Sequence, residues 1–141
     1  MRVICPYCHR DARLVNGVAI YPHRPDLAAK QFWDCRPCDA WVGVHPPSKR
    51  WNPTGVKPLG RLANAELRRE KQRAHAAFDP LWMSREMTRQ AAYAWLAQAL
   101  GASPANCHIG MFDVDACRAV VAAVRARMHT ATTPTWGRPR P

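Results

Sequence analysis

Hydrophobic residues in the second half of the chain recur at helical spacing and predict an amphipathic helix from about residue 63. Apolar side chains return every three, four or seven positions, while most of the cations fall elsewhere on the helix surface. Pro80 disfavours helical geometry in the residue before it, so the helix is expected to end near Asp79. The stripe expected to face the core is Ala63, Leu67, Ala74, Phe78 and Leu81.

Two more helices are predicted between residues 84 and 128. Ser84 is a suitable N-cap for the first, which Gly101 then terminates, and Asp113 is a suitable N-cap for the second. The expected inner faces are Met87, Ala91, Ala94, Trp95 and Leu100 in one helix and Cys117, Val120, Val121, Val124 and Met128 in the other. From about His129 the chain has proline breaks and no periodicity, so residues 129–141 are expected to be disordered.

The first 48 residues show strand patterns instead. The stretch "RLVNGVAIY" has Asn16-Gly17 between valine-containing segments, which predicts a hairpin with a two-residue turn, and "AWVGVH" has the composition of a further short strand. Prolines make residues 49–62 an irregular connector to the helical domain, residues 63–128. The predicted fold class is α+β, with an N-terminal ribbon of short antiparallel hairpins packed with, or tethered to, a C-terminal three-helix layer.

The N-terminal segment contains two Cys-x-x-Cys motifs, "CPYC" at residues 5–8 and "CRPC" at residues 35–38, and these motifs predict that the ribbon is a zinc ribbon. Two such loops can fill a closed tetrahedral shell, and the 26 residues between Cys8 and Cys35 suit a hairpin that brings the loops together. The predicted ligands of one structural Zn²⁺ are Cys5, Cys8, Cys35 and Cys38. Disulfides and a thioredoxin-like redox pair are the alternatives; a reducing compartment disfavours the first, and the second lacks a βαβ context.

The chain is strongly basic, and this narrows the choice of partner. Its 141 residues carry 21 Lys and Arg against 10 Asp and Glu, a formal net charge of +11, and the excess survives the negative charge of a zinc–tetrathiolate centre. The sequence lacks an apolar run long enough for a membrane span and a signal segment at its start, so a soluble, unexported chain without a membrane partner is expected. Nucleic acid, DNA or RNA, is the leading partner class, and no small-molecule substrate is evident.

Candidate contacts to a phosphate backbone lie near the cysteine loops, on the connector and on the first helix. They are Arg10, Arg13, Arg36, Lys49, Arg50, Trp51, Arg68, Arg69 and Arg73. For each arginine the alternative is a solvated side chain that keeps a small domain soluble. Trp51 either offers a ring for base stacking or pins the connector to the core.

Several separated motifs together resemble a known family. They are "CPYC", "WDCRPCDAWVGVHP", "PLGRLANAELRREKQRAHAAFDPLW", "RQAAYAWLAQALG" and "CHIGMFDVDAC", and they cover about residues 4 to 125. They are similar to a family of small, mostly phage- and prophage-encoded proteins with a zinc-finger domain and no characterised function. The resemblance implies zinc binding at the four cysteines, a phage or prophage origin and a place in the cytoplasm of a bacterial host, and it supplies no reaction.

The helical half contains a second group of chemically capable residues: His75, Asp79, Cys107, His108 and Cys117. His75 and Asp79 are four residues apart and project together from one helix face, so a second metal site or a nuclease base at His75 is possible. The favoured alternative is structural, with the cysteines packed in the core and Asp79 capping the next turn. The leading function is therefore non-catalytic nucleic-acid binding or regulation, ahead of docking to a host protein and of a metal-dependent nuclease.

Overall fold

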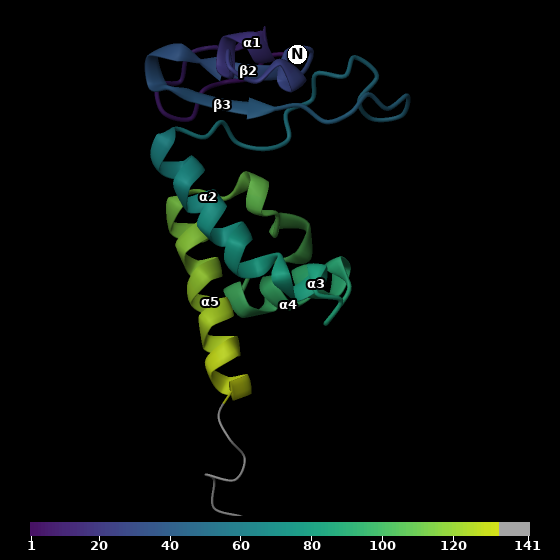
Figure 1. The fold of residues 1–141 in the computed structure, drawn as a ribbon, viewed down its shortest axis with the longest axis vertical. Helices are drawn as coiled ribbons and strands as arrows, with labels where there is room; N and C mark the ends of the chain where they lie inside the picture. The colour runs from purple at the N-terminus through teal and green to yellow at the C-terminus, as the bar shows by residue number, and fades with distance from the viewer. Residues whose placement is uncertain (133–141) are drawn as a thin grey trace, which may run out of the picture. The chain divides into compact units, whose positions relative to one another are not determined.

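The computed structural model describes residues 1–132, and the chain divides into two compact units, with the division between Arg68 and Arg69. We call them the ribbon unit and the helical unit. The ribbon unit contains all the strands of the described chain, and the helical unit contains its long helices apart from the first turn of α2 (Ala65–Phe78). In Figure 1 the ribbon unit runs from purple through blue to teal, and the helical unit runs from the teal of α2 through green to yellow.

A three-stranded antiparallel sheet forms the centre of the ribbon unit, with the strand order β1-β2-β3. The strands are β1 (Arg13–Asn16), β2 (Gln31–Cys35) and β3 (Ala40–Gly43), and Figure 1 shows β2 beside β3. In the register of β2 and β3, Cys35 lies opposite Ala40, so the second Cys-x-x-Cys motif forms the turn between these strands. The α+β fold class with a zinc ribbon and short antiparallel strands is confirmed.

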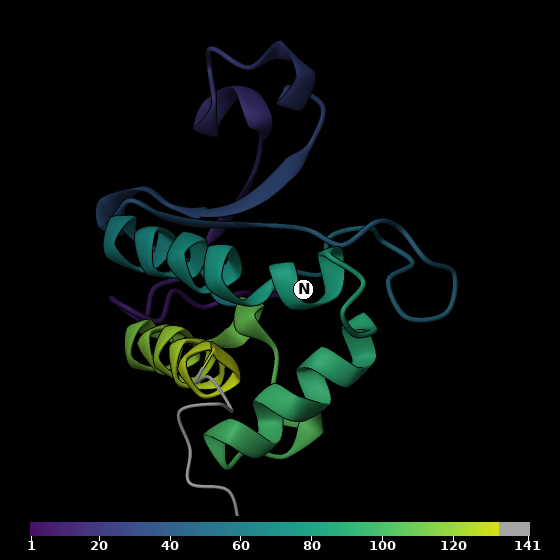
Figure 2. The same ribbon diagram turned by 60° about the horizontal axis from the view of Figure 1, so that its bottom comes forward.

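The two-residue hairpin turn predicted at Asn16-Gly17 is wrong. β1 does end at Asn16, but Gly17 begins the one-turn helix α1 (Gly17–Ile20), and residues 17–30 connect β1 to β2. Figure 2 shows this connection as a lobe beyond the strands. A glycine is required at position 17 because the backbone of Leu27 lies against it, and not because of a tight turn. A Cβ atom at this position would lie 1.7 Å from the carbonyl oxygen of Leu27.

The proline-rich segment follows the outer edge of β3. Residues 44–64 contain no helix or strand, as expected from their prolines. Their backbone nevertheless pairs with the sheet: Trp41 and Ala63 exchange two hydrogen bonds of 3.2 and 2.9 Å, and the Leu59 N–H donates to the Gly43 carbonyl at 2.9 Å. The segment thus covers an edge that would otherwise expose unpaired backbone groups.

The helical unit consists mainly of α2, α4 (Arg89–Leu100) and α5 (Val114–Thr132), with the single turn α3 (Pro80–Met83) after α2. Figures 1 and 2 both show α2 beside α5. The whole stripe predicted for the first helix is buried, with Ala74 and Phe78 fully inaccessible. The predicted ends are also confirmed: Gly101 has a φ of 67°, and Asp113 Oδ1 accepts a 2.8 Å hydrogen bond from the Ala116 N–H.

The start and the inner face predicted for the middle helix, α4, are both wrong. Arg85 has a φ of 64°, which interrupts helical geometry after Ser84, and Thr88 caps α4 instead by accepting a hydrogen bond from the Ala91 N–H. The buried residues of α4 are Ala92, Leu96 and Ala97. At the far end, residues 129–132 continue α5, and the rest of the predicted tail lies outside the described residues.

Length and hydropathy argue against a transmembrane role for any described helix. Even α5, with 19 residues, lacks an apolar stretch that would let it cross a bilayer. The described helices instead bury one face each, as α2 and α4 do, and leave charged side chains such as Arg89 and Arg125 exposed on the other.

Candidate metal centre

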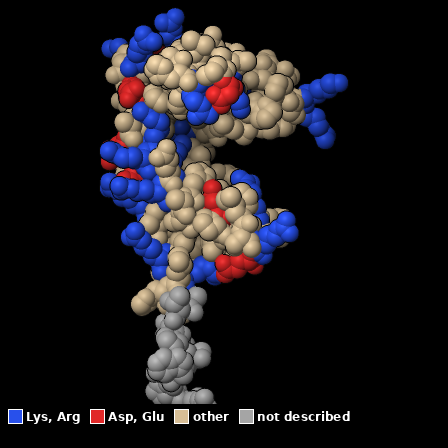
Figure 3. Space-filling model, viewed as in Figure 1, with Lys and Arg blue, Asp and Glu red and all other residues tan. Residues whose placement is uncertain are grey.

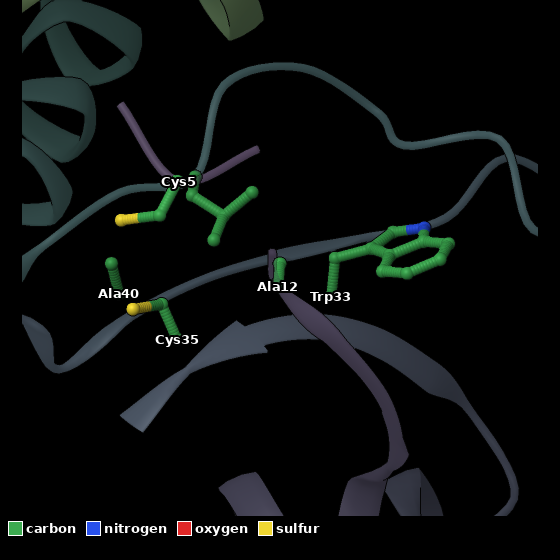
Figure 4. Close-up of a cluster of buried hydrophobic side chains, with 6 residues drawn as sticks. Cys5, Ala12, Trp33, Cys35 and Ala40 are labelled. Carbon is green, nitrogen blue, oxygen red and sulfur yellow. The ribbon is translucent and has the colours of Figure 1, made fainter. Parts of the chain in front are cut away.

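Four thiols from the two Cys-x-x-Cys motifs converge in the ribbon unit. The Sγ atoms of Cys5, Cys8, Cys35 and Cys38 all lie within 4.8 Å of one another. Cys5 and Cys35 are buried, and in Figure 4 their sulfur atoms lie at the same end of the core cluster, away from Trp33. Among the described residues these four cysteines are the only group of three or more His, Cys, Asp or Glu that could hold a metal ion.

Each motif forms a tight turn between paired backbone segments. Ile4 pairs with Asp11 around the first motif, as Cys35 pairs with Ala40 around the second. The residue after the second cysteine has a left-handed backbone in both turns, with φ values of 63° at His9 and 51° at Asp39. Each turn thus passes through a left-handed residue directly after its second cysteine, in a region where Asp and His are among the enriched non-glycine residues.

The spacing of the sulfur atoms fits a tetrahedral zinc ion. Cys8 Sγ and Cys35 Sγ are 3.6 Å apart, and zinc with Zn–S bonds of about 2.3 Å requires sulfur–sulfur separations of about 3.8 Å. A disulfide requires about 2.05 Å, and all six cysteines are free. Both motifs contribute to one cluster, so the four cysteines make one structural zinc site and not two redox pairs.

The electrostatics of the cluster favour a cation at its centre. The backbone N–H of Arg10 lowers the pKa of the Cys8 thiol to about 7. Burial, followed by the neighbouring cysteines, raises the pKa of Cys38 to about 12. Without a metal the cluster therefore keeps some of its thiols protonated, because adjacent thiolates repel one another, and a bound divalent ion offsets that repulsion as the thiols lose their protons. When bound, zinc supplies a cross-link between the two loops, and four sulfur ligands leave no open position for a substrate.

The zinc loops are tied to the rest of the ribbon unit by a residue that the sequence analysis did not single out. Tyr7, between the first two cysteines, donates its hydroxyl hydrogen to the Leu62 carbonyl at 3.0 Å and accepts a hydrogen bond from the Asn64 N–H at 3.1 Å. Burial raises the pKa of this hydroxyl, so it remains a donor at neutral pH. The presence of a tyrosine inside a Cys-x-x-Cys loop could have indicated such a role. Its hydrogen-bond partners, however, lie more than fifty residues away in the sequence.

Comparison with known protein families matches residues 1–127 to a family described as a zinc-finger-containing domain. The chain belongs to this family. The zinc-finger-containing domain thus spans both units and includes the helices as well as the cysteine loops. A search of curated proteins and a search of solved structures each returned no match.

The helical half of this zinc-finger-containing protein does not assemble the second metal cluster considered from the sequence. His75 Nδ1 lies 3.2 Å from both carboxylate oxygens of Asp79, so this pair does form. Asp79 is the N-cap residue of α3, but its side chain makes no capping hydrogen bond there. Cys107 and Cys117 are buried, and burial raises the pKa of each thiol. Cys107 and His108 line a cavity of about 650 Å³, together with Arg89, Gln90, Tyr93, Ala94 and Pro104.

The candidate nucleic-acid contacts separate into distinct groups. Arg10, Arg13 and Arg36 are all exposed and line one hollow of about 670 Å³ beside Cys35. On the connector, Lys49, Arg50 and Trp51 are exposed as well. On α2, Arg69 is exposed and Arg73 lies 3.3 Å from Glu70.

Arg68 is held by the ribbon unit and has little freedom to meet a phosphate. Its Nη1 donates to the carbonyls of Asp39 and Ala63 at 2.7 and 2.8 Å, and its guanidinium carbon lies 3.6 Å from the centre of the Trp41 ring. A planar guanidinium satisfies several acceptors while stacking on an aromatic face. Arg68 therefore joins the turn after the zinc loop to the start of α2.

Arg68→Ala is expected to destabilise the ribbon unit, whereas the adjacent Arg69→Ala leaves its stability nearly unchanged. The first substitution removes the hydrogen bonds to the Asp39 and Ala63 carbonyls and the stacking of the guanidinium on the Trp41 ring, and it lowers the free energy of unfolding by about 1–3 kcal/mol. The second removes an exposed side chain, with an effect within about 0.5 kcal/mol. Urea unfolding of both variants in the presence of zinc measures the difference; equal midpoints would contradict the structural role of Arg68.

Proposed function

We propose that this zinc-finger-containing protein binds nucleic acid through its ribbon unit, mainly by contacts to phosphates. The observation that carries the proposal is the hollow that Arg10, Arg13 and Arg36 share. These arginines come from two segments that are distant in the sequence: Arg10 and Arg13 follow the first cysteine motif, and Arg36 lies inside the second. The fold around the cysteines brings them together on one surface. Guanidinium groups converging on a concave surface suit the binding of phosphate groups.

The acidic neighbours of this hollow do not cancel its positive charge. Asp11 also lines the hollow, but its carboxylate already forms an ion pair with Arg2, whose Nε donates a 2.6 Å hydrogen bond to Asp11 Oδ1. Asp34, opposite Arg13 in the sheet, is partly buried, and burial raises the pKa of its carboxyl. Part of the arginine charge offsets the thiolates around zinc, and the remainder is available to a ligand.

Lys and Arg also exceed Asp and Glu on the face of the molecule that Figure 3 shows. In Figure 3 blue side chains outnumber red ones over each unit. Such a field speeds the encounter with a polyanion and makes its affinity depend steeply on salt. The resemblance to phage and prophage proteins extends the proposal to a non-catalytic or regulatory role in the cytoplasm of a bacterial host.

The test compares two triple variants that remove the same charge. R10Q/R13Q/R36Q empties the hollow of arginine, and R24Q/R85Q/R125Q removes exposed arginines elsewhere. At 0.1 M salt the first is expected to bind a labelled 20-nucleotide duplex or single strand about 100-fold more weakly, with a salt dependence shallower by about 2–3 in log–log slope. Fluorescence anisotropy over a salt series measures both quantities. Equal losses in the two variants would reduce the effect to net charge and contradict a site at the hollow.

The two other functions have less support. Docking through surplus tryptophans is weakened because Trp33 is buried in the ribbon core and Trp41 lies under Arg68. A nuclease needs clustered carboxylates to hold Mg²⁺, and the described residues contain no such group.

A further inference from the structure

The loop between residues 44 and 58 carries cations and an exposed aromatic ring without a nearby acid in the sequence. From Ala40 to Ala65 the chain has no Asp or Glu. Lys49, Arg50 and Lys57 are exposed on this loop, and Trp51 is 50% exposed. In Figure 3, blue side chains stand out at the end of the ribbon unit that this loop occupies in Figure 1. An exposed tryptophan among cations requires an explanation, because burial is the usual state of that side chain.

A buried asparagine, and not Trp51, holds this loop in place. Asn52 is only 2% exposed. Its Nδ2 donates to the carbonyls of His45 and Pro46 at 2.9 Å, and its Oδ1 accepts a 3.0 Å hydrogen bond from the Lys57 N–H. The backbones of Ser48 and Asn52 exchange two more hydrogen bonds of 2.9 and 3.0 Å. Trp51 therefore does not pin the connector to the core, and its ring remains at the surface of an ordered loop.

A glycine completes the closed shape of the loop. Gly55 has a φ of 69°, a conformation that other residues rarely adopt. A Cβ atom there would also approach Pro47 Cγ to 3.1 Å. The loop thus combines a buried amide, a left-handed glycine and four prolines, so that little conformational entropy remains to be lost when a ligand binds its tip.

The surroundings of the Trp51 ring suit a nucleotide. Lys57 Nζ lies 4.5 Å from the ring centre, and the His45 ring lies 4.8 Å away at an interplanar angle of 70°. Lys57 is an exposed, flexible side chain, so a base can take its position on the ring face while its ammonium group moves to the adjoining phosphate. Lys49 and Arg50 directly precede the ring and can contact the next phosphates.

We propose that the loop of residues 44–58 is a stacking site for single-stranded nucleic acid, in which an unpaired base lies on Trp51 and its phosphates contact Lys49, Arg50 and Lys57. The proposal rests on the proposed function and narrows its partner to single strands. The hollow beside the zinc site, by contrast, suits the phosphates of single-stranded and double-stranded nucleic acid alike. In a duplex both faces of each base are covered by neighbouring pairs. A stacking ring therefore discriminates in favour of single strands.

The experiment compares Trp51→Ala and Trp51→Phe with Leu59→Ala in the full-length, zinc-loaded protein. Leu59 is a suitable control because it lies in the same segment and is also 50% exposed. The probes are a labelled 20-nucleotide poly(dT), its RNA counterpart and a duplex of equal length. Trp51→Ala is expected to weaken single-strand binding roughly 5- to 100-fold, with duplex binding nearly unchanged and Trp51→Phe intermediate. Leu59→Ala is expected to match the wild type on every probe.

The outcomes separate this proposal from the one on which it rests. If Trp51→Ala binds poly(dT) and RNA like the wild type while R10Q/R13Q/R36Q loses binding, the stacking site is overturned and the arginine hollow stands. An equal loss on duplex and single strand would also overturn it, since the ring would then not read unpaired bases. If the wild type binds none of the probes, both proposals fail, and a protein partner becomes the remaining occupant of the loop.

Discussion

Replacing Cys35 with serine is expected to remove zinc from the protein and unfold the ribbon unit. Cys35 is buried and contributes a sulfur to the cluster of four. Structural zinc contributes roughly 10–16 kcal/mol to the folding of small zinc fingers. The ribbon core offers little to replace it, because Trp33 and Leu62 are the only large non-cysteine side chains buried in that cluster, and each contributes about 2–3 kcal/mol.

Elemental analysis and hydrogen exchange resolved by segment measure this outcome. The wild type is expected to carry one zinc per chain, and Cys35→Ser much less, with amide protection lost in residues 1–68 and retained in α4 and α5. Cys107→Ser and Cys117→Ser are the matched controls, because both residues are buried cysteines outside the cluster. If Cys35→Ser kept its zinc or the amide protection of residues 1–68, the proposed zinc site would be contradicted. If the wild type carried two zinc ions and the control variants lost one of them, a second metal site would exist in the helical unit.

Phe78→Ala is expected to produce the largest loss of stability in the helical unit. Phe78 is fully buried near the end of α2, and its ring centre lies 4.7 Å from that of Tyr93 on α4. Truncating a buried phenylalanine removes its transfer free energy and leaves a cavity, which together cost about 3–5 kcal/mol. That is a large part of the stability of a unit this size.

Thermal unfolding followed by circular dichroism at 222 nm measures the effect on the helices. Met83→Ala provides the control, since Met83 is 66% exposed on the neighbouring turn, and its unfolding temperature is expected to stay close to that of the wild type. Zinc content is expected to remain at one per chain in both variants, because the cysteine cluster belongs to the ribbon unit. Phe78→Ala with a wild-type unfolding temperature would mean that this ring is not part of a packed core.

Some features follow from local patterns, and these were predictable. The two Cys-x-x-Cys motifs predict the four ligands and the structural role of a zinc site, because four thiolates at this spacing can fill a closed tetrahedral shell. Helical periodicity identified the buried stripe of α2 from Leu67 to Phe78, and Asp113 and Gly101 marked helix ends through their own hydrogen bonding and backbone freedom.

Other features depend on contacts between residues far apart in the chain, and periodicity carries no information about them. Gly17 was read as a turn residue, whereas its role is to admit the Leu27 carbonyl. Arg68 and Arg69 are equivalent in the sequence, yet only Arg68 reaches Asp39 and the Trp41 ring. The sequence likewise left open whether Trp51 pins the connector and gave no sign that the neighbouring Asn52 does so, yet the amide is buried and the ring exposed.

The sequence by itself therefore determined the zinc site, the fold class and the basic character of the protein, because each follows from residue type and spacing along the chain. Only the tertiary structure decided which cations share a surface. The convergence of Arg10, Arg13 and Arg36 on one hollow depends on the register of β1 with β2 and on the turns around the cysteines. Those are long-range pairings, and packing of the whole unit selects them.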